Sequence, residues 1–166
     1  ANLPQRNPLN LALVIDRSGS MSGQPLAEAR RCAEYVLDGL LPTDRLALVV
    51  YDDEVDTLVP AVPIADGREV IRRAIRGIAS GGSTNLHGGW YQGVQNLLPH
   101  VSQQTVSRVI LLSDGCANAG LVDPQAIWAQ CVEFAGAGVG TSTYGLGSGF
   151  NEDLMIGMAR SGHGTS

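Results

Sequence analysis

The sequence predicts an α/β protein in which helices pack around a mostly parallel β-sheet. Short, continuous apolar runs alternate along the chain with longer stretches whose apolar residues recur at helical spacing. These runs are too short for helices, and they suit strands that are buried on both faces. Hydrophobic residues make up 44% of the 166 residues and charged residues 16%, which excludes a disordered chain and fits one domain with a large core.

The first half of the chain is predicted to alternate strands and helices. Pro25 suits the first turn of a helix whose apolar residues recur through Leu40, and Asp66 with Glu69 resembles a capping box at the start of the next helix. In order, the elements are a lead-in segment (1–10), a strand (11–15), a helix (25–40), a strand (45–51), a shorter strand near the sheet edge (55–59) and a helix (66–78).

The second half continues the same alternation after a loop that is rich in Ser and Gly. Asp123 and Pro124 are typical of a helix start, and Asn151 opens the last helix. In order, the elements are the loop (80–85), a helix (86–98), a strand (109–112), a helix (123–137), a strand (140–146) and a helix (151–162). A further strand after Gly164 would complete the pattern. We therefore expect one domain at residues 11–166 that is truncated at its C-terminus.

Charge and cysteine content restrict the classes of function. The chain has 11 Lys and Arg against 16 Asp and Glu, and this negative balance argues against a nucleic-acid-binding protein. The three cysteines, Cys32, Cys116 and Cys131, match no zinc-binding spacing. Because Cys32 and Cys131 lie in apolar helical stretches, we expect buried free thiols. Free thiols and the lack of a signal peptide favour a cytoplasmic location.

Two aspartates follow buried strands of the predicted sheet. Asp16 comes directly after the first apolar run, and Asp114 comes shortly after the run at residues 109–112. In open parallel sheets, ligands bind beyond the carboxyl ends of the strands, where the strand order reverses. If these two strands are neighbours, the two carboxylates share one crevice. Buried like charges are unfavourable unless something neutralises them, and a divalent cation would do so.

Hydroxyl side chains accompany these aspartates. Ser18 and Ser20 alternate with Asp16 along an extended turn, so the three side chains can converge, and Thr84 lies on a separate loop. Carboxylate, hydroxyl and water ligands suit a hard ion such as Mg²⁺, Mn²⁺ or Ca²⁺ and suit zinc poorly. The alternative is a metal-free cluster, in which Asp and Ser form a turn and Thr84 caps the following helix.

Three segments together resemble a known family. Asp16-Arg-Ser-Gly-Ser20 resembles the D-x-S-x-S signature of von Willebrand factor type A domains. Gly81-Gly-Ser-Thr84-Asn85 resembles the loop that supplies the threonine of the family, and Ser113-Asp114-Gly115 resembles its second aspartate. The resemblance runs over essentially the whole chain. Because the inserted regions of integrins are lacking, the chain is similar to bacterial members.

The resemblance implies a fold and a role for each site residue. The family fold is a three-layer, Rossmann-like α/β/α arrangement whose mostly parallel sheet has one antiparallel edge strand, which residues 55–59 would form. At the metal-ion-dependent adhesion site (MIDAS) of the family, Ser18 and Ser20 would bind the ion directly. Thr84 would do so in the high-affinity arrangement. The aspartates, Asp16 and Asp114, would act directly or through water.

The predicted function is a binding module and not an enzyme. An Asp or Glu from a partner protein would complete the coordination of the ion, and the partner would be an extracellular ligand or part of a larger chain or complex. The alternative is a metal-dependent hydrolase that uses the same acidic crevice. It would need a base near the ion, but the motif segments contain no His and the chain has no Lys. Cys116 departs from the family pattern, where an acidic or polar residue is expected.

Overall fold

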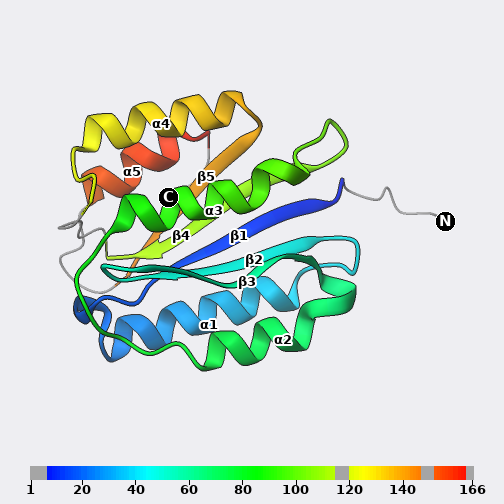
Figure 1. The fold of residues 1–166 in the computed structure, drawn as a ribbon, viewed down its shortest axis with the longest axis horizontal. Coiled ribbons are helices and arrows are strands. Elements are labelled where there is room, and N and C mark those ends of the chain that lie inside the picture. Colours follow the sequence, from blue (N-terminus) through cyan, green and yellow to red (C-terminus); the bar gives the residue numbers. More distant parts are fainter. Residues whose placement is uncertain (1–6, 115–119, 147–151, 164–166) are drawn as a thin grey trace.

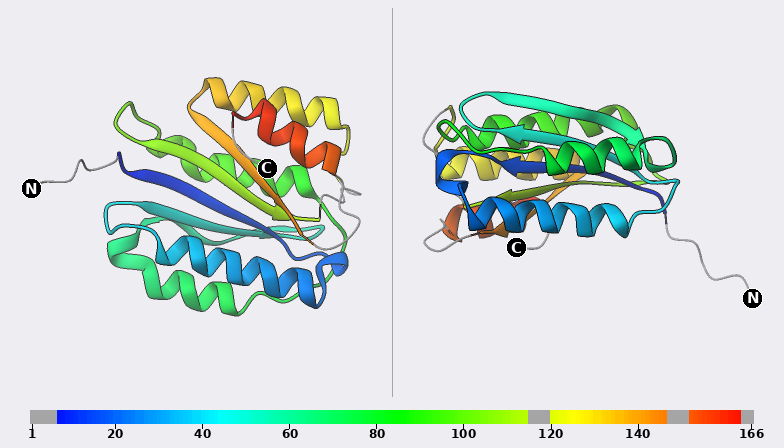
Figure 2. Two further views of the ribbon diagram at one scale, coloured as in Figure 1. Left: turned by 180° about the vertical axis from the view of Figure 1, so that it is seen from behind. Right: turned by 90° about the horizontal axis from the view of Figure 1, so that it is seen from below.

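A computed structural model describes residues 7–114, 120–146 and 152–163 of the chain. Within these residues, five strands form one sheet, and helices lie on both of its faces (Figure 1 and Figure 2). The strands are β1 (Leu9–Asp16), β2 (Arg45–Tyr51), β3 (Val55–Pro63), β4 (Val106–Ser113) and β5 (Val139–Gly145). The helices are α1 (Gln24–Asp38), α2 (Ile64–Arg76), α3 (Leu86–Leu97), α4 (Pro124–Gly136) and α5 (Glu152–Ser161), with short 3₁₀ turns η1 (Gly19–Met21) and η2 (Leu98–His100).

The order of the strands across the sheet is β3-β2-β1-β4-β5. β1 pairs in parallel with β2 and β4, and β4 pairs in parallel with β5, whereas β3 runs antiparallel to β2 at the edge. The predicted α/β class and the antiparallel edge strand are therefore confirmed. The chain leaves β1 toward β2 on one side and later returns to β4 on the other side. The strand order reverses at this point, which is where open α/β sheets bind their ligands.

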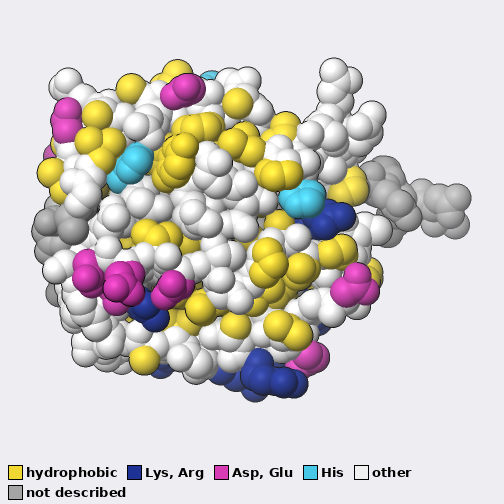
Figure 3. Space-filling model, in the orientation of Figure 1, with side chains coloured by type: hydrophobic (Ala, Val, Ile, Leu, Met, Phe, Trp, Pro, Cys, Tyr) yellow, Lys and Arg dark blue, Asp and Glu magenta, His cyan; other side chains and the backbone are white. Residues whose placement is uncertain are grey.

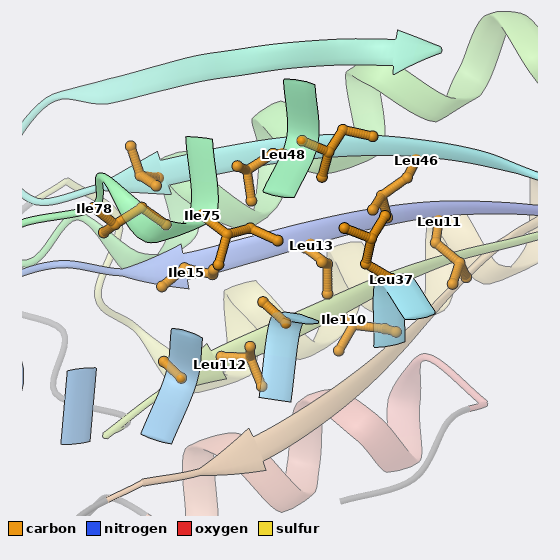
Figure 4. Packing of buried hydrophobic residues seen from close by; sticks show 14 of the residues in the cluster. Leu11, Leu13, Ile15, Leu37, Leu46, Leu48, Ile75, Ile78, Ile110 and Leu112 are labelled. Carbon is orange, nitrogen blue, oxygen red and sulfur yellow. The ribbon is translucent and has the colours of Figure 1, made fainter. Parts of the chain in front are cut away.

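β1 lies at the centre of the sheet, and its side chains alternate between two cores. Leu11, Leu13 and Ile15 belong to the core under α1 and α2 (Figure 4), whereas Ala12 and Val14 belong to the core under α3. Burial of a large aliphatic side chain contributes about 1.5–3 kcal/mol to stability. Burial on both faces explains why this strand has a continuous apolar run instead of alternating apolar and polar residues.

α3 crosses the second face of the sheet at close range. A Cβ atom at Gly89 would overlap the ring of Tyr51, and one at Gly93 would lie 2.6 Å from Cγ2 of Val14. The glycines of this helix therefore permit the tight packing that the sequence indicates. α4 and α5 contribute to the same core beside β5 (Figure 1).

The start of α2 differs from the sequence prediction. The helix begins at Ile64, its N-cap is Pro63, and Asp66 lies within its first turn, so the capping box of Asp66 and Glu69 is wrong. The first helical N–H groups need no side-chain cap, because backbone carbonyls accept their hydrogen bonds. The N–H of Ile64, for example, donates to the carbonyl of Asp44 at 2.8 Å.

Two further predictions are corrected. The first strand begins inside the expected lead-in segment, because Leu9 already pairs with Val106 of β4, and the N–H of Leu9 donates a hydrogen bond to Oδ1 of the buried Asp44 at 2.9 Å. Cys32 is exposed, because it lies beside the face that α1 buries and not on it. Cys131 is buried as expected, and burial raises the pKa of its thiol to about 12.

The two ends of the sheet are unlike. The carboxyl ends of β1, β2 and β4 lie together at one end, shown at the left of Figure 1. At the opposite end, the exposed residues 102–104 connect η2 with β4. None of the described helices is long and apolar enough to cross a membrane.

Candidate metal site

Asp16 is the last residue of β1, and its carboxylate is fully buried. Its Oδ1 accepts a hydrogen bond from the N–H of Ser18 at 2.8 Å, and its Oδ2 accepts one from the hydroxyl of Ser113 at 2.8 Å. The first bond fixes the start of the loop that follows β1. The second joins this carboxylate to the end of β4, so residues from two neighbouring strands meet at one point.

The two serines of the first motif lie close to each other. The hydroxyls of Ser18 and Ser20 are 3.1 Å apart, with Ser18 buried and Ser20 exposed. Ser18 is the N-cap of η1, yet its side chain does not cap this turn. Its hydroxyl instead contacts that of Ser20, which favours a role for this pair other than helix capping.

The loop of Thr84 is held against the first motif by backbone hydrogen bonds. The N–H of Gly19 donates to the carbonyl of Gly82 at 3.0 Å, and the N–H of Gly81 donates to the carbonyl of Arg17 at 2.8 Å. Thr84 is only 2% exposed. The cap of α3 is Asn85, whose side chain accepts a hydrogen bond from the N–H of Gly88, so Thr84 does not serve as the cap.

Asp114 directly follows β4 and is also buried. Burial raises the pKa of Asp16 above its ordinary value of 3.8, and the negative charge of Asp114 raises it further. Hydrogen bonds from Ser18 and Ser113 act in the opposite direction and lower it. The effect of Asp114 on this pKa indicates that the two carboxylates share one electrostatic environment, as the strand order predicts.

This donor set fits a hard divalent cation. Two buried carboxylates that repel each other lose that repulsion when a cation binds between them, and hydroxyl oxygens are suitable further ligands. The structure joins Asp16, Ser18, Ser20 and Ser113 by hydrogen bonds, and it places Asp114 and Thr84 on adjoining segments. Direct coordination of an ion by the five predicted residues stays a prediction. Among the residues that the structure describes, no group of three or more His, Cys, Asp or Glu side chains is arranged so that these side chains alone could hold a metal ion.

Acidic side chains lie beside this site, on the turn between β2 and β3. Arg17 forms ion pairs with Asp52 at 3.5 Å and with Asp56 at 3.1 Å, and the N–H of Asn85 donates to the carbonyl of Asp52. Figure 3 shows a group of acidic side chains, with a basic one next to it, at the same end of the molecule. The acidic pair Asp52 and Asp53 thus lies on a turn, as the sequence predicts.

Two neighbours of the site are absent from the predicted set of ligands. Ser113 belongs to the third motif, and its hydrogen bond to Asp16 could be anticipated from its place at the end of β4. Tyr51 ends β2 directly beside Asp16, but its sequence context is that of an ordinary apolar strand. Cys116, which departs from the family pattern, lies outside the described residues.

The family assignment follows from a match that extends over nearly the whole sequence. Residues 10–165 match the family described as von Willebrand factor type A domain. The chain belongs to this family. This von Willebrand factor type A domain is 30% identical to an uncharacterized protein of Synechocystis sp., sll0103, over 97% of its own length and 37% of that protein. It is also 30% identical to inter-alpha-trypsin inhibitor heavy chain H3 of Mesocricetus auratus, over 96% of its own length and 19% of that protein.

Solved structures show the same fold at lower sequence identity. The von Willebrand factor type A protein from Catenulispora acidiphila superimposes with a TM-score of 0.81 at 17% identity, over 96% of this domain and 38% of that chain. Proximal thread matrix protein 1 from the mussel byssus, with a zinc-occupied MIDAS motif, superimposes with a TM-score of 0.77 at 18% identity. The match covers 97% of this domain and 44% of the mussel chain. The manganese-loaded TRAP protein from Plasmodium vivax superimposes with a TM-score of 0.72 at 17% identity. The match covers 93% of this domain and 63% of the TRAP chain.

Proposed function

We propose that this domain is a protein-binding module that depends on a divalent metal ion, in which an acidic residue of the partner completes the coordination of the ion. The observation that carries the proposal is the arrangement around Asp16. A buried carboxylate is hydrogen-bonded to the first motif and to the end of β4, and it lies within electrostatic range of Asp114. The resemblance of these segments to the MIDAS pattern supports this position for the metal.

The side chains at the proposed site have two different roles in binding the ion. Asp16 and Asp114 supply negative charge, directly or through water, while Ser18, Ser20 and Thr84 supply neutral oxygens. A divalent ion with neutral oxygens in its first shell keeps part of its positive charge, and it can accept one more anionic oxygen. Ser20 is the exposed member of the serine pair and therefore marks the side from which a partner approaches. The proposal assigns no catalytic step to these residues.

Two structural relatives support a divalent ion in general. One was solved with zinc in its MIDAS motif and another was solved loaded with manganese. The oxygen donors of this domain favour Mg²⁺, with Mn²⁺ or Ca²⁺ as alternatives. The mussel protein shows that zinc also belongs among the ions to be tested.

The proposed partner is a protein that offers an Asp or Glu carboxylate. The bound ion would be the local positive charge that attracts this carboxylate to an otherwise acidic domain. The net charge of the chain is -5. Arg17, a basic side chain near the site, already forms ion pairs with Asp52 and Asp56. The domain spans well under half of the curated relatives that it matches, 37% and 19% for the two named above. We therefore propose that it acts as a part of a larger chain or complex.

The metal can be tested without knowledge of the partner. Calorimetric titration with Mg²⁺, Mn²⁺, Ca²⁺ and Zn²⁺ is expected to show one site per domain. Substitution of Asp16 with Ala is expected to weaken binding by more than about 100-fold, since loss of an outer-shell partner alone costs about 10–100-fold. A matched Asp66→Ala variant, which alters an exposed aspartate in the first turn of α2 at the opposite end of the sheet, should bind as the wild type does.

The acidic partner can be tested with displayed peptides. Peptides that are selected on the domain in Mg²⁺ and eluted with EDTA are expected to share an Asp or Glu, and their binding should vanish on the Asp16→Ala variant. Selection of peptides without a carboxylate, or retention of the peptides in EDTA, would refute bridging by an acidic group. If the calorimetric titrations detect no heat of binding with any of the four ions, the proposal that the domain binds a divalent metal is wrong.

A further inference from the structure

Tyr51 contains an unexplained polar atom beside the proposed metal site. It is the last residue of β2, it lies opposite Asp16 in the pairing of β2 with β1, and it is fully buried. Its hydroxyl has no hydrogen-bond partner among the described residues. A buried donor without a partner costs about 1–3 kcal/mol, so its presence calls for a reason.

The side chain of Tyr51 lies on the same face of the sheet as those of Asp16 and Ser113. Side chains of every second residue share a face, and Ala12, Val49 and Leu111 all lie in the core under α3. The same alternation places Asp16, Tyr51 and Ser113 on that face, at the carboxyl ends of three adjacent strands.

The phenol is a permanent donor in this environment. Burial raises the pKa of Tyr51 well above its ordinary value of 10, and the carboxylates of Asp16 and Asp114 raise it further. Its hydrogen is therefore retained at neutral pH. Hydrogen-bonding contributions from Ser113, which lowers this pKa, and from Asp16, which raises it, place the hydroxyl beside the hydrogen bond between Ser113 and Asp16, although it makes no hydrogen bond of full geometry with either residue.

The position of the ring is fixed by close packing. A Cβ atom at Gly89 would overlap Cδ1, Cγ and Cβ of Tyr51, so the ring lies directly against the backbone of α3. The hydroxyl therefore cannot turn away to water, and any hydrogen bond must be made by a neighbouring group that moves toward it.

We propose that Tyr51 is a positioning residue of the metal site, whose hydroxyl donates a hydrogen bond to the Asp16 carboxylate when a divalent ion is bound. Each oxygen of this carboxylate accepts one hydrogen bond from Ser18 or Ser113, and each retains a second lone pair for an ion or for another donor. An ion that binds one lone pair would shift the Asp16 carboxylate, and the fixed phenol of Tyr51 would then donate to the other lone pair that the shift brings within reach. The inference rests on the proposed metal binding.

The mechanism predicts effects of opposite sign in the presence and absence of metal. Tyr51→Phe removes only the hydroxyl and keeps the ring against α3. Without metal the variant loses a buried donor that lacks a partner, so its melting temperature in EDTA should equal or exceed that of the wild type. With metal it loses the hydrogen bond to Asp16, so the Kd for Mg²⁺ should rise about 10-fold or more, as loss of an outer-shell partner does.

The test compares the wild type, Tyr51→Phe and Tyr35→Phe by calorimetry with Mg²⁺ and by thermal unfolding in EDTA. Tyr35 lies on α1 and is 82% exposed, so its variant should match the wild type in both measurements. Addition of Mg²⁺ should also change the tyrosine absorption of the wild type and not that of Tyr51→Phe. This spectroscopic readout would not respond to a purely structural role of the ring.

The possible outcomes separate this inference from the proposed function. If the wild type binds Mg²⁺ and Tyr51→Phe binds it equally well, the positioning role is wrong while the metal site stands. If Tyr51→Phe melts below the wild type in EDTA, the hydroxyl has a structural partner and the inference is also wrong. If the wild type binds no ion, the proposed function fails and this inference fails with it.

Discussion

Asp16 illustrates how a single residue can oppose folding and still define the site. Its carboxylate is fully buried beside the charge of Asp114, and these effects raise its pKa despite two hydrogen bonds. The bonds from Ser18 and Ser113 hold the side chain where it is but do not compensate for the loss of water. The residue therefore destabilises the metal-free fold in its charged form, and a bound cation would remove this effect.

The raised pKa of Asp16 predicts the direction of a pH effect. The folded, metal-free domain binds this proton more tightly than the unfolded chain does, so the free energy of unfolding should fall as pH rises from 3.8 through the folded pKa. Asp16→Asn cannot ionise, and the Ser113 hydroxyl can reverse to accept from its amide. The variant should therefore exceed the wild type in stability at pH 7 in EDTA, by a margin that shrinks toward pH 4.

Denaturant unfolding at several pH values measures this effect. Asp53→Asn serves as the control for general charge changes, because Asp53 is exposed on the turn after β2. An Asp16→Asn variant that is less stable than the wild type at pH 7 would contradict the pKa argument.

The sequence could indicate some site residues and not others, for a physical reason. Asp16, Ser18 and Asp114 are polar where a buried strand has just ended, so they are conspicuous in the sequence. Tyr51 is also at a strand end, but a tyrosine after Val49 and Val50 is equally typical of an apolar strand. Only the pairing of β2 with β1 shows that its hydroxyl lies beside a carboxylate.

At the level of elements, the edge strand and α2 show where sequence patterns fail. Pro60 and Pro63 interrupt the apolar run and suggest that the strand ends early, yet β3 continues to Pro63. An edge strand tolerates proline because one side of it needs no sheet hydrogen bonds. Local patterns also fail at the start of α2. Carbonyls that are distant in the sequence, and not neighbouring side chains, accept the hydrogen bonds of its first N–H groups.

The close approach of α3 to β2 predicts a destabilising substitution. Gly89→Ala would place a methyl group within the ring of Tyr51, which is fixed in the core, so unfolding should become easier by about 1–3 kcal/mol. Gly136→Ala is the matched control, because an added Cβ at this last position of α4 meets no atom within 4 Å. Chemical denaturation of both variants in EDTA provides the measurement, and equal stabilities would contradict the packing argument.

At the scale of the whole molecule, the order of strands brings the site together. Periodicity predicts which segments are strands and helices, but it does not determine which strands are neighbours. That β1 and β4 are neighbours could therefore be stated from the sequence only as a condition, and the observed order β3-β2-β1-β4-β5 places their ends side by side. Long-range pairing had to come from the structure and could not come from local patterns.

Coupling of metal binding to folding predicts a shift in overall stability. Unfolding separates the three segments of the site, so an ion that binds only the folded domain should stabilise it by about 2.7 kcal/mol at 100 times its Kd. For a chain of this size, this corresponds to a rise in melting temperature of roughly 5–11 °C. Scanning calorimetry with and without Mg²⁺ tests this, and the Asp16→Ala variant should show no comparable rise. An equal rise in both proteins would mean that the ion binds elsewhere.

The unlike ends of the sheet also determine how the domain should be mounted for binding studies. Residues 102–104 are exposed and lie at the amino end of β4, whereas Asp16 and Asp114 lie beyond the carboxyl ends of their strands. A tether attached at 102–104 would orient the crevice away from a solid support and toward the solution. A tether on the turn after β2 would instead hold the crevice against the surface and obstruct an approaching protein.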